Sequence, residues 1–193
     1  MYIRTVSPPE ATGDVAEIYR GELQSLGFIM EATACWTAVP GLAPMVEHLL
    51  ETARSNFSLG LLNWRLITLV AAREVPSTYC SHVYARLLAK ELGKDQVLAI
   101  QRDFRSAGLD EKTVAMLAYA QQVARDASKI GPADIETLRS AGFADQQIGE
   151  IAFCAALRCF LSRYFDAVGA SPEAVFFDPD PEFRAAMTVG KPI

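Results

Sequence analysis

The chain has 193 residues, a hydrophobic fraction of 51% and a formal net charge of −5. A chain of this length suits a single domain with a sizeable core. The negative net charge and the lack of any Lys or Arg cluster argue against nucleic acid or an anionic membrane as a partner, and no apolar run is long enough to suggest a membrane span.

Cysteine and histidine usage also limits the class of protein. The four cysteines are too scattered for a secreted disulfide framework, and the two histidines have no zinc-site spacing. The first residues show no basic segment followed by an apolar one, as a secretory signal would. We therefore expect a cytoplasmic protein with reduced thiols, no metal and no cofactor.

Helical periodicity recurs along the chain, and no stretch alternates as a half-buried strand would, so the sequence predicts an all-α fold. Ser7 and Glu10 have the spacing of a capping box, and Ser58, Asp110 and Asp145 are expected to cap later helices. The expected helices are 8–27, 30–39, 43–57, 59–74, 78–92, 94–107, 111–127, 132–141 and 146–168.

Two helices and the C-terminal end have distinctive patterns. The first long helix is expected to bury an apolar stripe, and the last one is apolar on every side from Ile151 to Leu157, as a core helix would be. Residues 170–193 are rich in Pro and Phe and are expected to be partly disordered or to pack on a neighbouring subunit, beyond a domain of residues 1–169. The expected stripe consists of Val15, Ile18, Tyr19, Leu23 and Leu26.

The stretch from Trp64 to Tyr84 is the first place to look for chemistry. An apolar helical run ends at Val75 and Pro76, and a second run begins with Cys80 in its first turn. Unpaired N–H groups and the helix dipole favour a thiolate at such a position. Arg65 stands out because a guanidinium in an apolar helix needs a partner or water.

Several segments together resemble the carboxymuconolactone decarboxylase and alkylhydroperoxidase D-like superfamily, in particular its peroxidase-related branch. The resemblance covers residues 2–169 and implies a single helical domain of about eight or nine helices, assembled as a dimer, trimer or hexamer. The segments that carry it are YIRTVSPPEATGDVAEIY, the helix pair around STYC, AMLAYAQQVARD, ETLRSAGFADQQIGEIAF and SRYFDAVG.

The resemblance also implies where the site lies. Redox-active relatives have a Glu, then Cys-x-x-Cys at a helix start, then a His one turn later. Here the attacking cysteine corresponds to Cys80, but Ser77 stands at the resolving position, Tyr84 at the His position and Arg65 at the Glu position. Ser77 cannot form a disulfide with Cys80, so we expect a pocket formed by these four residues in place of a dithiol.

His82 is a candidate of second rank. Two residues beyond Cys80, it projects about 200° around the helix from that thiol, so contact with another helix or subunit is its expected role. A bulge at the helix start would return it to the site.

Three functions remain open at this point. The first is a single-cysteine thiol peroxidase, an antioxidant enzyme that reduces hydroperoxides through Cys80 and is regenerated by an external thiol. The second is a non-redox decarboxylase or lactone-type enzyme that acts on a small carboxylate through Tyr84, Arg65 or His82. The third is an oligomeric binding protein that has lost catalysis.

Overall fold

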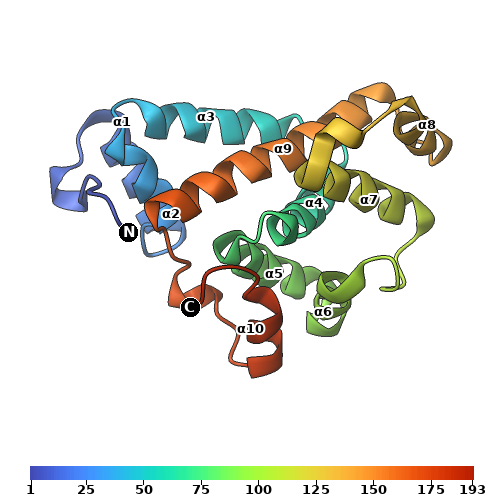
Figure 1. Cartoon of the computed structure of the whole chain (residues 1–193). Coiled ribbons are helices and arrows are strands. Elements are labelled where there is room, and N and C mark those ends of the chain that lie inside the picture. The colour runs from blue at the N-terminus through green and yellow to red at the C-terminus, as the bar shows by residue number, and fades with distance from the viewer.

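The computed structural model describes all residues 1–193 and contains only helices (Figure 1). There are ten α-helices, one more than the nine expected from the sequence, because the short α10 lies in the C-terminal extension. The expected helix 30–39 is divided between α2 and a 3₁₀ helix. The α-helices are α1 (Gly13–Ser25), α2 (Glu31–Ala34), α3 (Leu42–Ser55), α4 (Gly60–Glu74), α5 (Thr78–Leu92), α6 (Lys94–Asp103), α7 (Glu111–Asp126), α8 (Pro132–Ser140), α9 (Asp145–Val168) and α10 (Pro181–Met187). Short 3₁₀ helices are η1 (Pro8–Glu10), η2 (Cys35–Ala38), η3 (Ala127–Lys129) and η4 (Ala174–Phe176).

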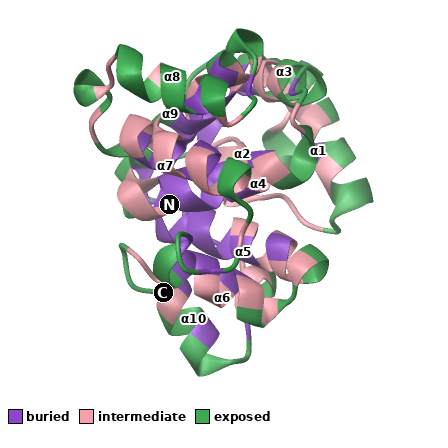
Figure 2. Ribbon diagram, turned by 90° about the vertical axis from the view of Figure 1, so that its right-hand side faces the viewer, coloured by how far each residue is buried: buried purple, intermediate pink, exposed green.

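Helix α4 lies at the centre of the fold, in contact with α5, α7 and α9 (Figures 1 and 2). The seven consecutive residues 66–72 are all buried, which covers nearly two turns and therefore the whole circumference of the helix. Small residues such as Ala71 and Ala72 let neighbouring helices approach closely at the end of this segment. The apolar run read from the sequence is thus the core helix.

Several predicted helix ends are confirmed. Ser7 and Glu10 form the capping box, the Asp110 carboxylate accepts a bond from the Thr113 amide of α7, and Pro132 begins α8. Gly169 ends α9 in the left-handed region, with φ 76°, which a residue with a side chain rarely adopts.

Two predicted caps were wrong, because side chains of other helices bond to the same groups. Ser58 precedes Leu59, the true N-cap of α4, and both its amide and its hydroxyl bond to Glu150 of α9. Asp145 is the first residue of α9, and its carboxylate pairs with Arg139.

The predicted apolar faces were also partly wrong. In α1 only Tyr19 is buried, and Leu23 and Leu26 are 47% and 45% exposed. In α9, Phe153 is 47% exposed although Ile151 and Cys154 are buried. Amphipathic spacing identifies a helix, but it does not say how much of the stripe another element covers.

The C-terminal extension packs on its own chain, against α5 and α6. Phe183 and Met187 of α10 are buried there, and the buried carboxylate of Asp178 accepts a bond of 2.6 Å from Lys94. Although burial opposes its charge, Lys94 and the amide of Asp180 hold the pKa of Asp178 below its ordinary value. The apolar residues of the extension therefore have a partner within the same chain.

We expect the substitution Asp178→Asn to loosen the extension. The substitution removes the buried negative charge of residue 178 that pairs with Lys94. We expect this loss to lower the unfolding free energy by about 1–3 kcal/mol. Urea denaturation would measure the loss, and limited proteolysis would show cleavage within residues 170–193. Asp14→Asn, at an exposed position, is the matched control, and equal stability of the two variants would contradict the expectation.

Candidate active site

The sulfur of Cys80 lies between α5 and α9. Cys80 is the third residue of α5 and is 1% exposed. Arg158 donates from Nη1 to Cys80 Sγ at 3.3 Å, and the Ser162 hydroxyl donates to the same sulfur at 3.2 Å. Two donors from one face of α9, four residues apart, thus converge on the thiol.

Arg158 also joins Cys80 to Tyr84, one turn further along α5. Its Nη2 donates to the Tyr84 hydroxyl oxygen at 2.8 Å, and the guanidinium carbon lies 4.7 Å from the centre of the Tyr84 ring. The Tyr84 hydroxyl accepts this bond, and its own proton has no acceptor in the protein. The tyrosine can therefore donate that proton to a ligand.

The charge of Arg158 is unusual because it is buried without a carboxylate. The residue is 5% exposed, no Asp or Glu lies within ion-pair distance, and its Nε has no hydrogen-bond partner. Burial works against the charge, but Tyr84 and Cys80 raise the pKa of the guanidinium above its ordinary value. A buried cation needs a compensating anion, and the two groups in contact that can become one are the Tyr84 hydroxyl at 2.8 Å and the Cys80 thiol at 3.3 Å. A thiol ordinarily ionises more readily than a phenol, so Cys80 is the better candidate.

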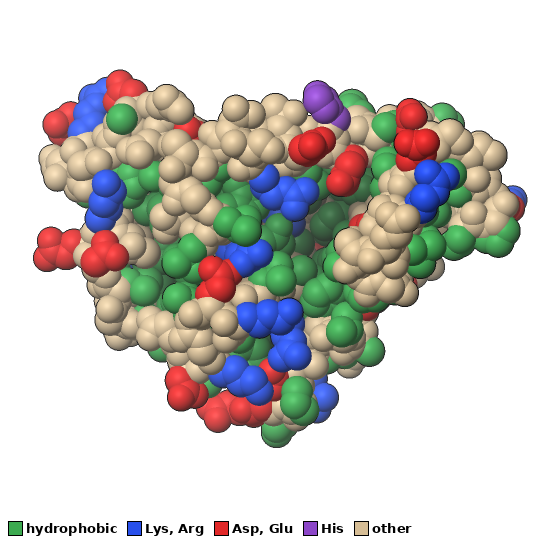
Figure 3. All heavy atoms as spheres, turned by 180° about the vertical axis from the view of Figure 1, so that it is seen from behind, with side chains coloured by type: hydrophobic (Ala, Val, Ile, Leu, Met, Phe, Trp, Pro, Cys, Tyr) green, Lys and Arg blue, Asp and Glu red, His purple; other side chains and the backbone are tan.

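A pocket of about 380 Å³ opens onto these groups. Cys80, Tyr84 and Arg158 line it together with apolar side chains from α3, α5 and α9 and from the segment around α2. Seen from behind, the molecule is hollowed in the middle, with apolar side chains inside and acidic and basic side chains around the edge (Figure 3). The pocket suits a small organic ligand with a polar group next to Arg158.

Two half-buried carboxylates hold the segment around α2 over this pocket. Glu22 accepts bonds from the Met30 amide and the Thr33 hydroxyl, and Glu173 accepts from Tyr79 and from the Glu31 amide. Burial raises the pKa of both Glu22 and Glu173. The pocket wall is therefore fixed by hydrogen bonds to residues of α1, α5 and the C-terminal extension.

Of the residues expected at the site, Cys80 and Tyr84 line the pocket, and Arg65 does not. Arg65 forms an ion pair with Glu91 at the other end of α5. The cation expected across from Cys80 is Arg158 instead. The sequence analysis missed it, although the signal that singled out Arg65, an arginine within an apolar helix, applies equally to Arg158.

Ser77 is the N-cap residue of α5, but its hydroxyl makes no capping bond. The side chain is fully buried and its Oγ has no hydrogen-bond partner. Ser77 does not line the pocket with Cys80. The structure thus places it beneath the helix start, apart from the groups that surround the sulfur.

His82 lies on the face of α5 that meets the C-terminal extension. Its Nε2 is 3.1 Å from the Thr188 hydroxyl oxygen, and because that hydroxyl donates to the Arg184 carbonyl, His82 is the donor in this contact. Its ring also meets the Phe177 ring edge to face. Burial, with a smaller contribution from Arg184, lowers the pKa of His82 to about 4.

No family model matches the sequence, and no curated protein matches it. Solved structures do match the fold. An uncharacterized peroxidase-related protein from Silicibacter sp. TM1040 is 21% identical, with a TM-score of 0.79 over 89% of this chain and 93% of that one. The alkylhydroperoxidase AhpD core of an uncharacterized peroxidase-related protein from Ralstonia eutropha JMP134 is 20% identical, with a TM-score of 0.77 over 98% of this chain and 97% of that one.

The debrominase Bmp8 has a similar fold. Its apo structure is 20% identical, with a TM-score of 0.71 over 89% of each chain. A cysteine-to-alanine variant of Bmp8 was crystallised in complex with 2,3,4-tribromopyrrole. The chain therefore has the AhpD-like helical fold of peroxidase-related proteins, as its sequence predicted, in a single domain. None of its helices is long and apolar enough to cross a membrane.

We expect Arg158→Met to slow the alkylation of Cys80 by iodoacetamide about tenfold at neutral pH, which corresponds to ~1.4 kcal/mol. The methionine keeps an extended apolar stem but removes the cation that favours the thiolate. Mass spectrometry would follow the modification of Cys80. Arg65→Met is the control, since Arg65 bonds only to Glu91, and equal rates in the two variants would contradict the assignment of Arg158.

We also expect stability to depend on pH through His82. The unfolded chain regains the ordinary pKa of about 6.5 and binds a proton that the folded chain rejects until about pH 4. The unfolding free energy is therefore fully present above about pH 6.5 and falls as the pH decreases, by at most about 1.4 kcal/mol per pH unit from this residue.

Urea denaturation between pH 4 and 7 would measure this slope. His82→Gln should reduce it, whereas His48→Gln, which changes the exposed histidine of α3, is the control. An unchanged slope in His82→Gln would contradict the expectation.

Proposed function

We propose that this protein is a thiol peroxidase that uses one cysteine, Cys80, to reduce organic hydroperoxides. The observation that carries the proposal is the buried Arg158, which has no carboxylate partner and donates to Cys80 Sγ at 3.3 Å. A protonated guanidinium at this distance favours the thiolate, which is the form that attacks peroxides. The pocket in front of the sulfur admits a small organic molecule.

In the first step, the Cys80 thiolate attacks the terminal oxygen of the hydroperoxide. An S–O bond forms, the O–O bond breaks, and the remaining oxygen leaves as an alcohol after it takes a proton. Tyr84 is placed to supply that proton, because its hydroxyl lines the pocket and has no other acceptor. Arg158 stabilises the charge that moves from sulfur to the departing oxygen and then the Tyr84 phenolate, which regains its proton from water that enters the pocket.

The sulfenic acid that results needs a thiol from outside the chain. Ser77 cannot form a disulfide, and burial raises the pKa of both Cys35 and Cys154 to about 12, so neither is a thiolate near neutral pH. Cys35 Sγ instead donates to the Ala32 carbonyl. On this proposal an external thiol reduces Cys80 and completes the cycle.

The setting of this activity is part of the same proposal. All four cysteines are free, which suits a reducing compartment such as the cytoplasm and an antioxidant role there. Exposed apolar side chains on α3, α4 and α9 support assembly into a homo-oligomer. They are Met45, Leu61, Leu62, Phe153 and Phe160.

A second candidate function is non-redox chemistry on a small carboxylate or lactone. The pair of Arg158 and Tyr84 favours it, because a buried cation and a hydroxyl without an acceptor could bind a carboxylate and transfer a proton. In this case Cys80 would not take part in turnover. The structural neighbour Bmp8, a debrominase, binds its tribromopyrrole in a variant that lacks a cysteine.

We expect cumene hydroperoxide to convert Cys80 selectively to a sulfenic acid. Dimedone would trap the product, and mass spectrometry would locate it at Cys80 and not at the half-buried Cys159. Tyr84→Phe should lower the rate of oxidation about 10- to 100-fold, because the proton donor is lost. Cys80→Ser is the control and should abolish hydroperoxide consumption in the presence of thiols.

Two results would contradict the proposed peroxidase function. One is an absence of sulfenic acid at Cys80 in the wild-type protein. The other is turnover of a lactone or carboxylate that survives Cys80→Ser but is lost in Tyr84→Phe, which would favour the non-redox enzyme.

A further inference from the structure

The helix that carries Cys80 is closed on the face away from the pocket. The C-terminal extension covers this face through three contacts: Ser81 with Met187, His82 with Thr188, and Thr78 with Gly190. Ser77, Thr78, Ser81 and His82 are all between 0% and 3% exposed. The extension therefore covers Ser81 and His82 on this face of α5, next to Cys80 in the sequence.

Gly190 shows how closely the extension lies against the helix start. A Cβ atom at this position would come within 1.8 Å of the Pro76 carbonyl oxygen, so only glycine fits. The Gly190 amide donates to the Thr78 hydroxyl at 2.9 Å. The backbone of the extension is thus in direct contact with the turn between α4 and α5, where the resolving cysteine would stand in a dithiol site.

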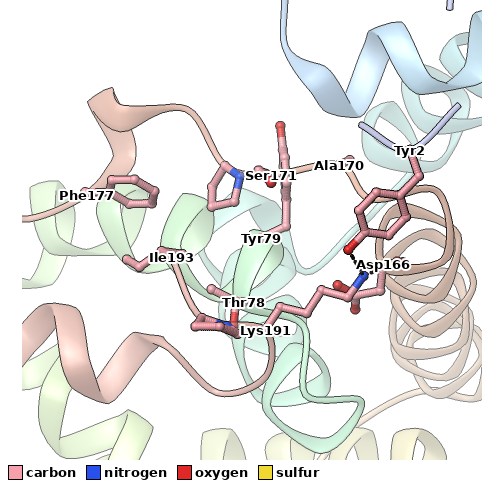
Figure 4. A pocket seen from close by; sticks show the side chains of 12 residues that line it. Tyr2, Thr78, Tyr79, Asp166, Ala170, Ser171, Phe177, Lys191 and Ile193 are labelled. Carbon is pink, nitrogen blue, oxygen red and sulfur yellow. Dashed lines mark hydrogen bonds between the residues drawn. The ribbon is translucent and has the colours of Figure 1, made fainter. Parts of the chain in front are cut away.

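A second cavity, of about 500 Å³, lies beside these contacts, between the start of α5 and the two ends of the chain (Figure 4). It is lined by Thr78 and Tyr79 of α5, by the end of α9 and by both chain ends, and Cys80 is not among its residues. Tyr79 lines both cavities, and its hydroxyl is held by Glu173 and by the Ala32 amide. This tyrosine therefore separates the second cavity from the pocket of Cys80.

The geometry of a disulfide then limits what can reach Cys80. Two half-cystines need an S–S bond of about 2.05 Å and Cα atoms no more than about 7 Å apart. The Cα of Cys80 lies in α5, which is packed against α4, α6, α9 and α10. The backbone of a reducing protein would have to enter this interior, whereas a small thiol needs only the 380 Å³ pocket.

We propose that the reductant of Cys80 is a low-molecular-weight thiol that enters through the same pocket as the hydroperoxide, and not a cysteine of another protein. This inference rests on the proposed peroxidase function. One thiol condenses with the sulfenic acid to give a mixed disulfide and water. A second thiol attacks the outer sulfur of that disulfide, releases Cys80 as a thiolate beside Arg158, and leaves as the oxidised small disulfide.

The overall reaction converts one hydroperoxide and two thiols to one alcohol, one disulfide and one water molecule. Because both substrates use one opening, the hydroperoxide must leave as alcohol before the thiol enters. Steady-state kinetics should then show the parallel double-reciprocal lines of a ping-pong mechanism.

The test uses full-length protein with the background substitution Cys159→Ser, so that Cys80 is the only reactive thiol. Cys80 is labelled with 4,4′-dithiodipyridine, and the release of thiopyridone is followed by absorbance after addition of 2-mercaptoethanol or reduced thioredoxin. The control carries Ser106→Cys with Cys80→Ser and Cys159→Ser, which places the label at an exposed position after α6.

We expect the ratio of the thioredoxin rate to the 2-mercaptoethanol rate to be at least tenfold lower at Cys80 than at position 106. A smaller difference would overturn the inference. Failure of 4,4′-dithiodipyridine to label Cys80 would also overturn it, and so would a disulfide between Cys80 and Cys35 after peroxide treatment.

The labelling test does not depend on peroxidase activity, because the label is introduced by a disulfide reagent and not by a peroxide. A failed peroxidase function and a failed access argument therefore give different results.

Discussion

The contact of Arg158 with Cys80 and Tyr84 is the interaction on which the site depends. It connects α5 to α9 and places a full positive charge in the interior, where no carboxylate compensates it. Such a charge is costly to bury, and proteins keep one where it serves a function or pairs with an anion. Of the two contacting groups that can ionise, the Cys80 thiol ordinarily does so more readily than the Tyr84 phenol, so the charge of Arg158 and the reactivity of the sulfur are linked.

A dithiol site of the kind that the sequence resemblance implies would need a second cysteine at the residue before α5. Ser77 is buried at this position, and the C-terminal extension lies against it, with Gly190 next to Pro76. The extension therefore covers one face of α5, while the pocket of Cys80 opens on another.

Features that depend on residues within one helix turn were predicted well, and features that depend on a side chain of another helix were not. Asp110 caps α7, Pro132 begins α8 and Pro76 separates α4 from α5, because these effects act within one turn. Ser58 and Asp145 have the right residue type for a cap, yet Glu150 and Arg139 bond to their side chains instead. Residue type therefore shows which side chains are able to cap a helix, but a hydrogen-bond partner on another helix can occupy the same side chain.

The sequence by itself determined the helices, the break after α4 and the place of Cys80 in the first turn of α5, because each follows from periodicity and local capping. It also singled out Tyr84, one turn away on the same helix face. Only the tertiary structure decided which cation meets the sulfur. Arg158 is 78 residues from Cys80, and Arg65, the nearer choice, turns to Glu91. The spacing of residues along one helix does not encode which face of a second helix packs against it, so that contact becomes visible only when α5 and α9 are in place.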